Sequence, residues 1–227
     1  YYDIDPDLAE EPSTRMQEFE ALVTRTHEVG LKVVLDFVPN HVARQYHSDT
    51  APEGVDDLGA HDNKEMHFSP SNNFYYIPRQ AFTPQFYIGE GEERYFEYPA
   101  KATGNDCFGA FPGEYDWYET VKLNYGVDYT GGGRCHFDPI PDTWYKMLDI
   151  LLFWCGKGAD AFRCDMAHMV PVEFWNWAIS KVKENYPSVI FIAEIYDQAL
   201  YRVYIEKGKF DYLYDKVGLY DKLRGVL

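Results

Sequence analysis

The sequence predicts an α/β fold with a parallel sheet, because strand-like and helix-like segments alternate along much of its 227 residues. Two apolar runs, 31–38 and 189–195, are nearly continuous, as expected of strands that are covered on both faces. A third run, 159–165, follows Gly158 and ends in charged residues, and a fourth strand-like run covers 210–214. Hydrophobic residues make up 46% of the chain, which is enough to build a substantial core.

Helices are predicted wherever apolar side chains recur at helical spacing. In the first one, Thr14 and Gln17 have the spacing of a capping box, and Gly30 is placed to end the helix. Alternation of such helices with the strands implies right-handed crossovers between parallel strands. The predicted helices cover residues 14–29, 142–156, 171–182 and 198–207.

A long segment between the first two strands, residues 42–135, has a different character. It is rich in Gly, Pro, Asn, Asp and aromatic residues and shows no helical stripe. A loop of this length is improbable inside a compact domain, so we interpret the segment as an inserted subdomain. The remaining residues, 1–41 and 136–227, have room for about four βα units of roughly 30 residues each. Because a complete barrel has eight units, we expect a (β/α)8 TIM-type barrel of which about half is present.

Charge and cysteine content narrow the classes of partner. A net charge of −16 disfavours nucleic acid and anionic membranes. Aromatic residues form 18% of the chain, and such rings suit neutral, hydroxyl-rich ligands such as sugars, although they also fill cores. The cysteines lack C-x-x-C spacing, which disfavours a zinc site or redox pair. Cys155 and Cys164 are expected to be buried thiols, whereas Cys107 and Cys135 could pair in an oxidising compartment.

Charged residues gather at the carboxyl ends of the three best strands, where parallel α/β folds place their active sites. The first strand ends at Asp36 and runs on to His41, the second carries Arg163 and Asp165, and the third ends at Glu194. Because alternate residues of a strand share a face, each strand can point its acid to the same side.

Two of these acids are candidates for a nucleophile and a proton donor. Asp165 shares a strand face with Arg163, so we expect its pKa to be lowered. Glu194 ends an apolar strand with no cation adjacent in sequence, so we expect its pKa to be raised. On neighbouring strands their carboxyl groups would approach the separation found in retaining glycosidases. Each residue alone is also explained as a cap or an ion-pair partner, and Asp36, Asp165 and Glu194 could instead bind a metal.

Three segments resemble the first three conserved stretches of the α-amylase superfamily, glycoside hydrolase family 13. They read DFVPNH (36–41), AFRCD (161–165) and IAE (192–194), in the order of that family. Residues 1–6 are similar to the segment after its second strand, and Leu123–Asn124 to a weaker stretch near the end of its inserted subdomain. The resemblance implies a (β/α)8 barrel with a domain B inserted after the third strand. It also implies a retaining double displacement on α-linked glucosides.

Residue by residue, the resemblance implies that Asp165 is the nucleophile and Glu194 the general acid/base. Arg163 would orient Asp165 and keep it charged. His41 would hydrogen-bond the sugar at the −1 subsite, and Asp36 would support the local network.

Other positions follow the family less closely. Met-Ala-His-Met follows the candidate nucleophile where many α-amylases have a Lys-His pair, so we expect His168 to replace part of that role. Asn124 is a further expected substrate contact. Asn40 matches a position that binds structural calcium in many α-amylases, but no cofactor is expected to be required. The third acid of the family would lie beyond Leu227, so we expect the chain to need the remaining barrel strands of a longer enzyme.

We therefore expect a retaining glycoside hydrolase that acts on α-linked glucans or malto-oligosaccharides. The alternatives are a transglycosidase of the same superfamily, a non-catalytic binding or assembly subunit, and a metal-dependent barrel enzyme. Retention of both visible acids favours an enzyme over a binding subunit.

Overall fold

A computed structural model describes residues 1–86 and 95–225 of the chain. The described residues form two compact units. The first unit contains residues 1–39 and 48–56 together with the described residues from Met147 onward, and the second contains 40–47 and 57–146.

The expected start of the insertion, residue 42, lies two residues after the start of the second unit, and its expected end, residue 135, lies eleven residues before the end of that unit. Residues 48–56, expected in the insertion, belong to the first unit. The expected insertion, 42–135, includes residues 87–94, and the expected barrel segment 136–227 includes residues 226–227; both stretches lie outside the described residues. The division into a partial barrel and an inserted domain stays a prediction.

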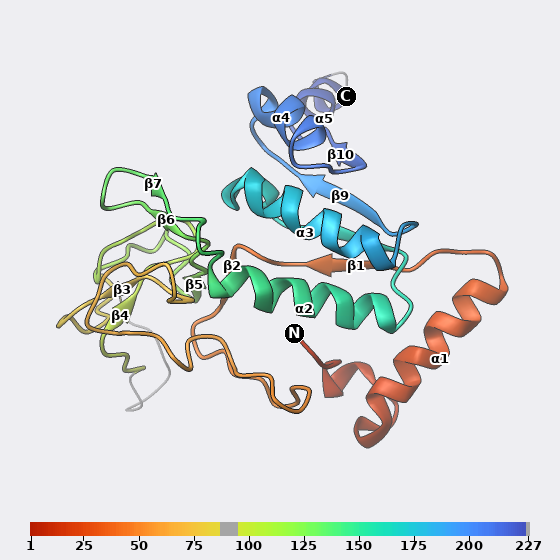
Figure 1. Ribbon diagram of the computed structural model, residues 1–227, viewed down its shortest axis with the longest axis horizontal. Coiled ribbons are helices and arrows are strands. Elements are labelled where there is room, and N and C mark those ends of the chain that lie inside the picture. Colours follow the sequence, from red (N-terminus) through yellow and green to blue (C-terminus); the bar gives the residue numbers. More distant parts are fainter. Residues whose placement is uncertain (87–94, 226–227) are drawn as a thin grey trace. The chain divides into compact units, whose positions relative to one another are not determined.

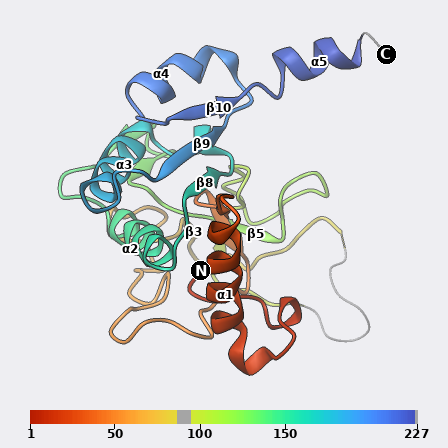
Figure 2. The same ribbon diagram turned by 90° about the vertical axis from the view of Figure 1, so that its right-hand side faces the viewer.

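The first unit is built on a parallel sheet of four strands in the order β1-β8-β9-β10. Figure 1 labels β1, β9 and β10, and Figure 2 labels β8. All three neighbouring pairs are parallel, which confirms the predicted α/β class with a parallel sheet. The register pairs Asp36 with Arg163 across β1 and β8, and Glu194 with Tyr214 across β9 and β10. The strands are β1 (Val34–Phe37), β8 (Ala161–Cys164), β9 (Ile190–Glu194) and β10 (Tyr212–Tyr214).

The helices follow the predicted ranges closely, with one addition near the end of the chain. Helix α5 was not predicted; it has seven residues, and none of them is buried. The α-helices are α1 (Arg15–Glu28), α2 (Asp142–Gly156), α3 (Val172–Asn185), α4 (Tyr201–Glu206) and α5 (Gly218–Arg224). Short 3-10 turns cover Pro6–Leu8, Pro12–Thr14, Ala167–Met169 and Gln198–Leu200.

Aromatic side chains form the core between the sheet and α3, which lies alongside β8 and β9 (Figure 2). The Phe162 ring on β8 lies 6.2 Å from Phe37 and 5.6 Å from Phe191, centroid to centroid. Trp175 on α3 is fully buried against Phe37, and its indole N–H donates to the Ala167 carbonyl at 2.9 Å. Trp177, two positions further along α3, is only half-buried, because two helical positions differ by about 200° around the axis.

The start of α1 differs from its sequence prediction. Thr14 and Gln17 do not form a capping box, since no side chain caps the helix at Thr14. The Glu18 carboxylate instead accepts hydrogen bonds from the Thr14 hydroxyl and from the backbone N–H groups of Glu10 and Glu11. Among the apolar residues of α1, Val23 alone is buried.

The second unit consists of short antiparallel pairs joined by irregular chain. A buried ion pair holds these segments: Arg44 Nη1 lies 2.7 Å from Glu97 Oε1, and Arg44 also donates to the carbonyls of Lys101, Tyr118 and Thr120. The pairs are β2 (His41–Ala43) with β5 (Thr120–Lys122), β3 (Tyr76–Ile77) with β4 (Ala100–Lys101), and β6 (Val127–Asp128) with β7 (Arg134–Cys135).

Over residues 1–86 and 95–225, no helix combines the length and the apolar character needed to cross a membrane. Cys155 and Cys164 are buried, as predicted. Within the same part of the chain, no disulfide joins Cys107 to Cys135.

Phe162→Ala should lower the free energy of unfolding by about 3–5 kcal/mol, because it leaves a cavity among buried aromatic rings. Val34→Ala on the adjacent strand is the matched control: Val34 is 49% exposed, and its truncation should cost less than about 1 kcal/mol. Urea denaturation followed by tryptophan fluorescence measures both. Equal losses in the two variants would contradict the core described here.

Candidate active site

Arg163 joins the ends of all four strands of the parallel sheet. Its Nη1 lies 2.7 Å from Asp36 Oδ1 and 2.8 Å from Asp165 Oδ1, and its Nη2 lies 2.6 Å from Glu194 Oε2. Its Nε and Nη2 donate to the Tyr214 hydroxyl at 3.1 and 2.9 Å. The structure thus brings together four residues that the sequence singled out, and it adds a tyrosine.

Sheet register explains why these side chains meet. Asp36 and Arg163 are directly paired on β1 and β8, and pairing continues beyond β8 because the Asp165 N–H donates to the Phe37 carbonyl at 2.8 Å. Glu194 and Tyr214 are paired on β9 and β10. Parallel strands in register end at one edge of the sheet, so their terminal side chains gather there.

The residue after Asp165 has an unusual backbone conformation. Met166 has φ 45° and ψ 41°, in the left-handed region that residues other than glycine seldom adopt. This conformation accompanies a hydrogen bond from the Met166 N–H to Glu194 Oε2 at 3.1 Å. The turn after β8 therefore presents a backbone donor to the acid at the end of β9, at a local cost of the kind found at functional sites.

The structure reverses the expected order of the two pKa values, and the first change is at Asp165. Burial raises the pKa of Asp165, and a hydrogen bond shared with Glu194 raises it further. These effects outweigh the opposing influence of the Arg163 guanidinium. The expected lowering was wrong because Arg163 divides its charge among several partners and the aspartate is mostly shielded from water.

Glu194 shows the opposite change. Burial alone would raise its pKa, but hydrogen bonds from Tyr214 and the Met166 N–H, together with the charge of Arg163, lower the pKa to about 2. The expected rise was wrong because the cation is absent only from the local sequence: Arg163 and Lys216 both reach Glu194 in the fold, Lys216 Nζ at 3.4 Å from Oε1.

His168 lies in the turn between β8 and α3. Its ring approaches the edge of Tyr196, centroid to centroid 6.0 Å, and its backbone carbonyl accepts from the Tyr204 hydroxyl at 3.1 Å. The ring Nδ1 is buried and makes no hydrogen bond in the described structure. A buried ring nitrogen of this kind is suited to a ligand contact. The expected role of His168 in substrate binding stays a prediction.

Three further side chains surround Glu194 that the sequence analysis did not single out. Tyr214 ends β10, and Tyr196 donates to Glu194 Oε1 at 3.3 Å. Lys216 contacts the Tyr196 hydroxyl as well as Glu194. The available signal was position: Tyr214 ends the strand-like run 210–214, as Asp36 and Glu194 end theirs.

His41 and Asn124, two predicted sugar-binding residues, belong to the second unit. His41 begins β2, and its ring lies 5.3 Å from Trp117. Burial, and then the charge of Lys122, lowers the His41 pKa, which favours a neutral imidazole. Asn124 is fully buried, its amide donating to the Ser69 carbonyl and accepting from the Gly126 N–H. A substrate contact for either residue stays a prediction.

The residues around Asn40 do not fit a calcium ion. Asn40 Oδ1 accepts from Lys122 Nζ at 2.8 Å, and Asn40 Nδ2 donates to the Gly104 carbonyl at 2.8 Å. The buried Lys122 ammonium also lies 2.6 Å from Asp106 Oδ1. The oxygen that would bind calcium is therefore held by a fixed cation of the protein itself, which would repel a divalent ion.

The metal-binding alternative for the three strand-end acids meets the same difficulty. The Arg163 guanidinium contacts Asp36, Asp165 and Glu194 and so occupies the space that a shared metal would need. Across the described ranges, no cluster of three or more His, Cys, Asp or Glu residues could hold a metal ion.

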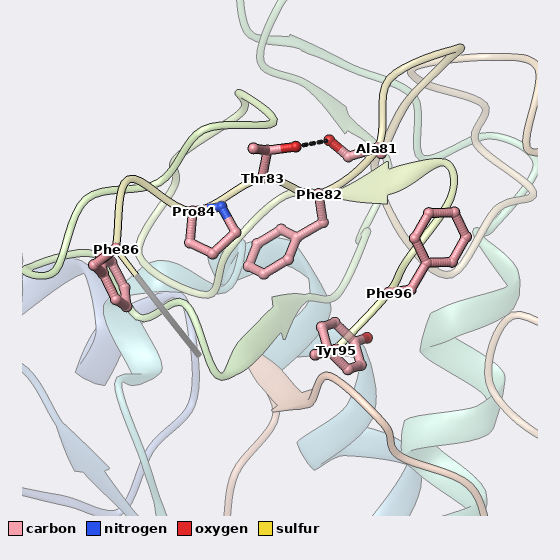
Figure 3. A pocket seen from close by; sticks show the side chains of 7 residues that line it. All are labelled: Ala81, Phe82, Thr83, Pro84, Phe86, Tyr95 and Phe96. Atoms are coloured by element: carbon pink, nitrogen blue, oxygen red, sulfur yellow. Dashed lines mark hydrogen bonds between the residues drawn. The ribbon is translucent and has the colours of Figure 1, made fainter. Parts of the chain in front are cut away.

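A cavity of about 290 Å³ in the second unit has a different chemistry (Figure 3). Phe82, Phe86, Tyr95 and Phe96 are among the residues that line it. Among the described residues that line it, none is a carboxylate, a histidine or a cation.

Comparison with known proteins relates the sequence to glucan-active enzymes. No protein-family model matches the chain. It is 47% identical over 186 residues to an α-1,4-glucan:maltose-1-phosphate maltosyltransferase of Corynebacterium pseudotuberculosis, covering 80% of this chain and 19% of that protein. Identity to the Cereibacter sphaeroides protein of the same name is 40% over 91 residues, covering 37% and 15% of the two chains. The chain thus spans less than a fifth of the length of either relative.

Solved structures show the same fold over nearly the whole chain. The α-amylase from H. orenii superposes with a TM-score of 0.57 at 21% identity, covering 95% of this chain and 38% of that one. The maltogenic amylase from S. marinus superposes with a TM-score of 0.56 at 22% identity, covering 95% and 28%. Together with the three strand-end stretches and the sequence relatives, this likeness of fold places the chain in the α-amylase superfamily, glycoside hydrolase family 13.

Proposed function

We propose that the protein is a retaining glycoside hydrolase that acts on α-linked glucans or malto-oligosaccharides. The observation that carries this proposal is the meeting of Asp165 and Glu194 on one guanidinium at adjacent strand ends. Two carboxyl groups so placed can act on opposite sides of one glycosidic bond, which is the requirement of a double displacement.

In the proposed first step, an Asp165 carboxylate oxygen attacks the anomeric carbon and the bond to the leaving oxygen breaks. Glu194 gives its proton to that oxygen, and a glycosyl ester forms on Asp165. In the second step, water attacks the anomeric carbon and gives a proton to the Glu194 carboxylate, and the ester bond breaks. Because the resting structure favours a charged Glu194, this acid must take up a proton before the first step.

The surrounding architecture is part of the same proposal. We infer that the parallel sheet belongs to a (β/α)8 barrel, that residues 42–135 form its inserted domain, and that a third acid comes from another part of the protein. The likeness of fold to α-amylases supports this arrangement. An α-glucan is the proposed substrate, since an acarbose complex is known for the similar α-amylase of Geobacillus thermoleovorans.

A second candidate is glycosyl transfer, which the sequence relatives favour. Both are named as maltosyltransferases that use maltose-1-phosphate and α-1,4-glucan. The glycosyl ester on Asp165 would be the same, and a glucan hydroxyl would replace water in the second step. Incubation with maltose-1-phosphate and a glucan acceptor separates the two: chain extension with phosphate release supports transfer, and free maltose supports hydrolysis.

Trapping of the glycosyl ester tests the proposed function directly. Incubation of the native protein with 5-fluoro-α-glucosyl fluoride, or its maltosyl counterpart, should give a mass increase that maps to Asp165. Asp165→Ala should give none. Glu194→Gln should lower turnover of natural glucans by about 10²–10⁴-fold, because it cannot donate a proton. An adduct on another residue, or near-normal turnover in either variant, would remove the assignment.

Arg163→Lys should lower kcat/KM by about 10²–10³-fold, because lysine is a point charge that cannot present a planar fork to four partners. Arg202→Lys is the matched control, since the Arg202 side chain is 85% exposed and pairs with Glu206 on α4. Steady-state kinetics, with thermal melting to verify folding, measure both. Equal activity of the two variants would show that the fork is dispensable.

EDTA should leave activity and melting temperature unchanged, because Arg163 and Lys122 occupy the places where cations would be expected. Assays before and after exhaustive chelation, with calcium added back, measure this. A loss of activity or of melting temperature that calcium restores would contradict the conclusion that Arg163 and Lys122 occupy these two places.

A further inference from the structure

We propose that Tyr214 is a positioning residue that connects Arg163 to Glu194 and makes Glu194 a stronger acid in the reaction. This inference rests on the proposed function, because it assigns a role to Tyr214 through the acid/base. It concerns strand β10, from which the sequence analysis drew no site residue.

Hydrogen-bond chemistry fixes the direction of the contacts around Tyr214. The Tyr214 oxygen receives N–H groups from Arg163 Nε at 3.1 Å and Nη2 at 2.9 Å. A guanidinium can only donate, so the phenol proton must point elsewhere. The acceptor is Glu194, with which the Tyr214 side chain shares a hydrogen bond. Burial and the Glu194 charge raise the Tyr214 pKa to about 12, which keeps this proton on the phenol at neutral pH.

The three groups form a closed triangle. Arg163 Nη2 contacts both the Tyr214 oxygen and Glu194 Oε2, and Tyr214 donates to Glu194. The sheet register also holds Tyr214 beside Glu194, because the two residues are directly paired on β10 and β9. A change in the position of the phenol therefore shifts the carboxyl group and the guanidinium together.

Other groups facing Glu194 define what Tyr214 adds. From β8 and its turn come Arg163, Asp165 and the Met166 N–H; from beyond β9 comes Tyr196; from beyond β10 comes Lys216. Asp36 lies across Arg163, and the His168 ring lies against Tyr196. Tyr214 is a neutral donor in this set, so its hydroxyl can be removed without changing any of the charges.

Tyr214 acts through the carboxylate that the first step produces. When Glu194 gives its proton to the leaving oxygen, its charge grows, and the hydrogen bond from Tyr214 strengthens with it. When Glu194 later receives a proton from water or an acceptor hydroxyl, that bond weakens. The Tyr214 proton stays on its own oxygen throughout, so Tyr214 sets the acid strength of Glu194 and transfers no proton.

Tyr214→Phe is the test, with the pH dependence of kcat/KM as the readout. Loss of a hydrogen bond to a carboxylate should move the alkaline limb, which reports the protonated acid, upward by about one pH unit. Turnover of a natural glucan should fall about tenfold at the optimum pH, whereas an activated aryl α-glucoside, whose leaving group needs little protonation, should lose much less.

Tyr212→Phe on the same strand is the matched control, because Tyr212 is 60% exposed. Its profile should equal that of the unmodified protein. An unshifted profile in Tyr214→Phe would overturn the inference. So would an equal loss on both substrates without a shift, since that pattern indicates only a structural role.

A second measurement is independent of turnover. Carboxyl-carbon NMR titration of Glu194 should show a higher midpoint in Tyr214→Phe than in the unmodified protein, and an unchanged midpoint overturns the inference. Trapping separates this failure from failure of the proposed function: an adduct on Asp165 with an unchanged Glu194 midpoint removes only the role of Tyr214. Absence of any adduct removes the proposed function itself.

Discussion

The contacts of the Arg163 guanidinium hold together the strand-end side chains of the parallel sheet in the first unit. Three acids end three adjacent parallel strands, and without a cation between them their charges would repel. One planar group with five donors can satisfy several oxygens at once, which an ammonium cannot do. The backbone turn at Met166 and the phenol of Tyr214 complete the same network, so the strand ends form one connected unit.

The second unit uses the same physical solution at different places. Lys122 is buried between Asn40 and Asp106, and Arg44 is buried against Glu97. Removing either cation would leave buried polar groups without a partner, which is costly in a protein interior. The second unit thus buries the cations of Arg44 and Lys122 in a chain with a net charge of −16, and they hold segments that have little regular secondary structure.

The formation of the glycosyl ester by the acid pair is a separate step from the choice between water and a sugar hydroxyl as acceptor. Asp165 and Glu194 would form and break the same glycosyl ester in hydrolysis and in transfer. Which hydroxyl reaches the anomeric carbon depends on the shape and water content of the acceptor side. The likeness in fold to amylases and the sequence likeness to maltosyltransferases are compatible for this reason.

Local sequence patterns determined which segments form helices and strands and which residues belong to the candidate site. Apolar runs and helical spacing located the four strands and the first three helices, and strand ends with matching parity predicted that Asp36, Arg163, Asp165 and Glu194 would gather. These features depend on neighbours a few residues away, so the sequence alone shows them. Membership of the superfamily also follows from contiguous stretches.

Only the tertiary structure decided how the site is charged. Tyr214 lies 51 residues from Arg163, and Lys122 lies 82 residues from Asn40. Neither contact leaves a trace in local sequence. The contacts around Glu194 reversed an expectation, because Glu194 is the stronger acid of the pair. The contact at Asn40 shows that its side-chain oxygen is held by an ammonium. Protonation and ion binding respond to every charge and dipole within a few ångströms, and the fold sets those distances.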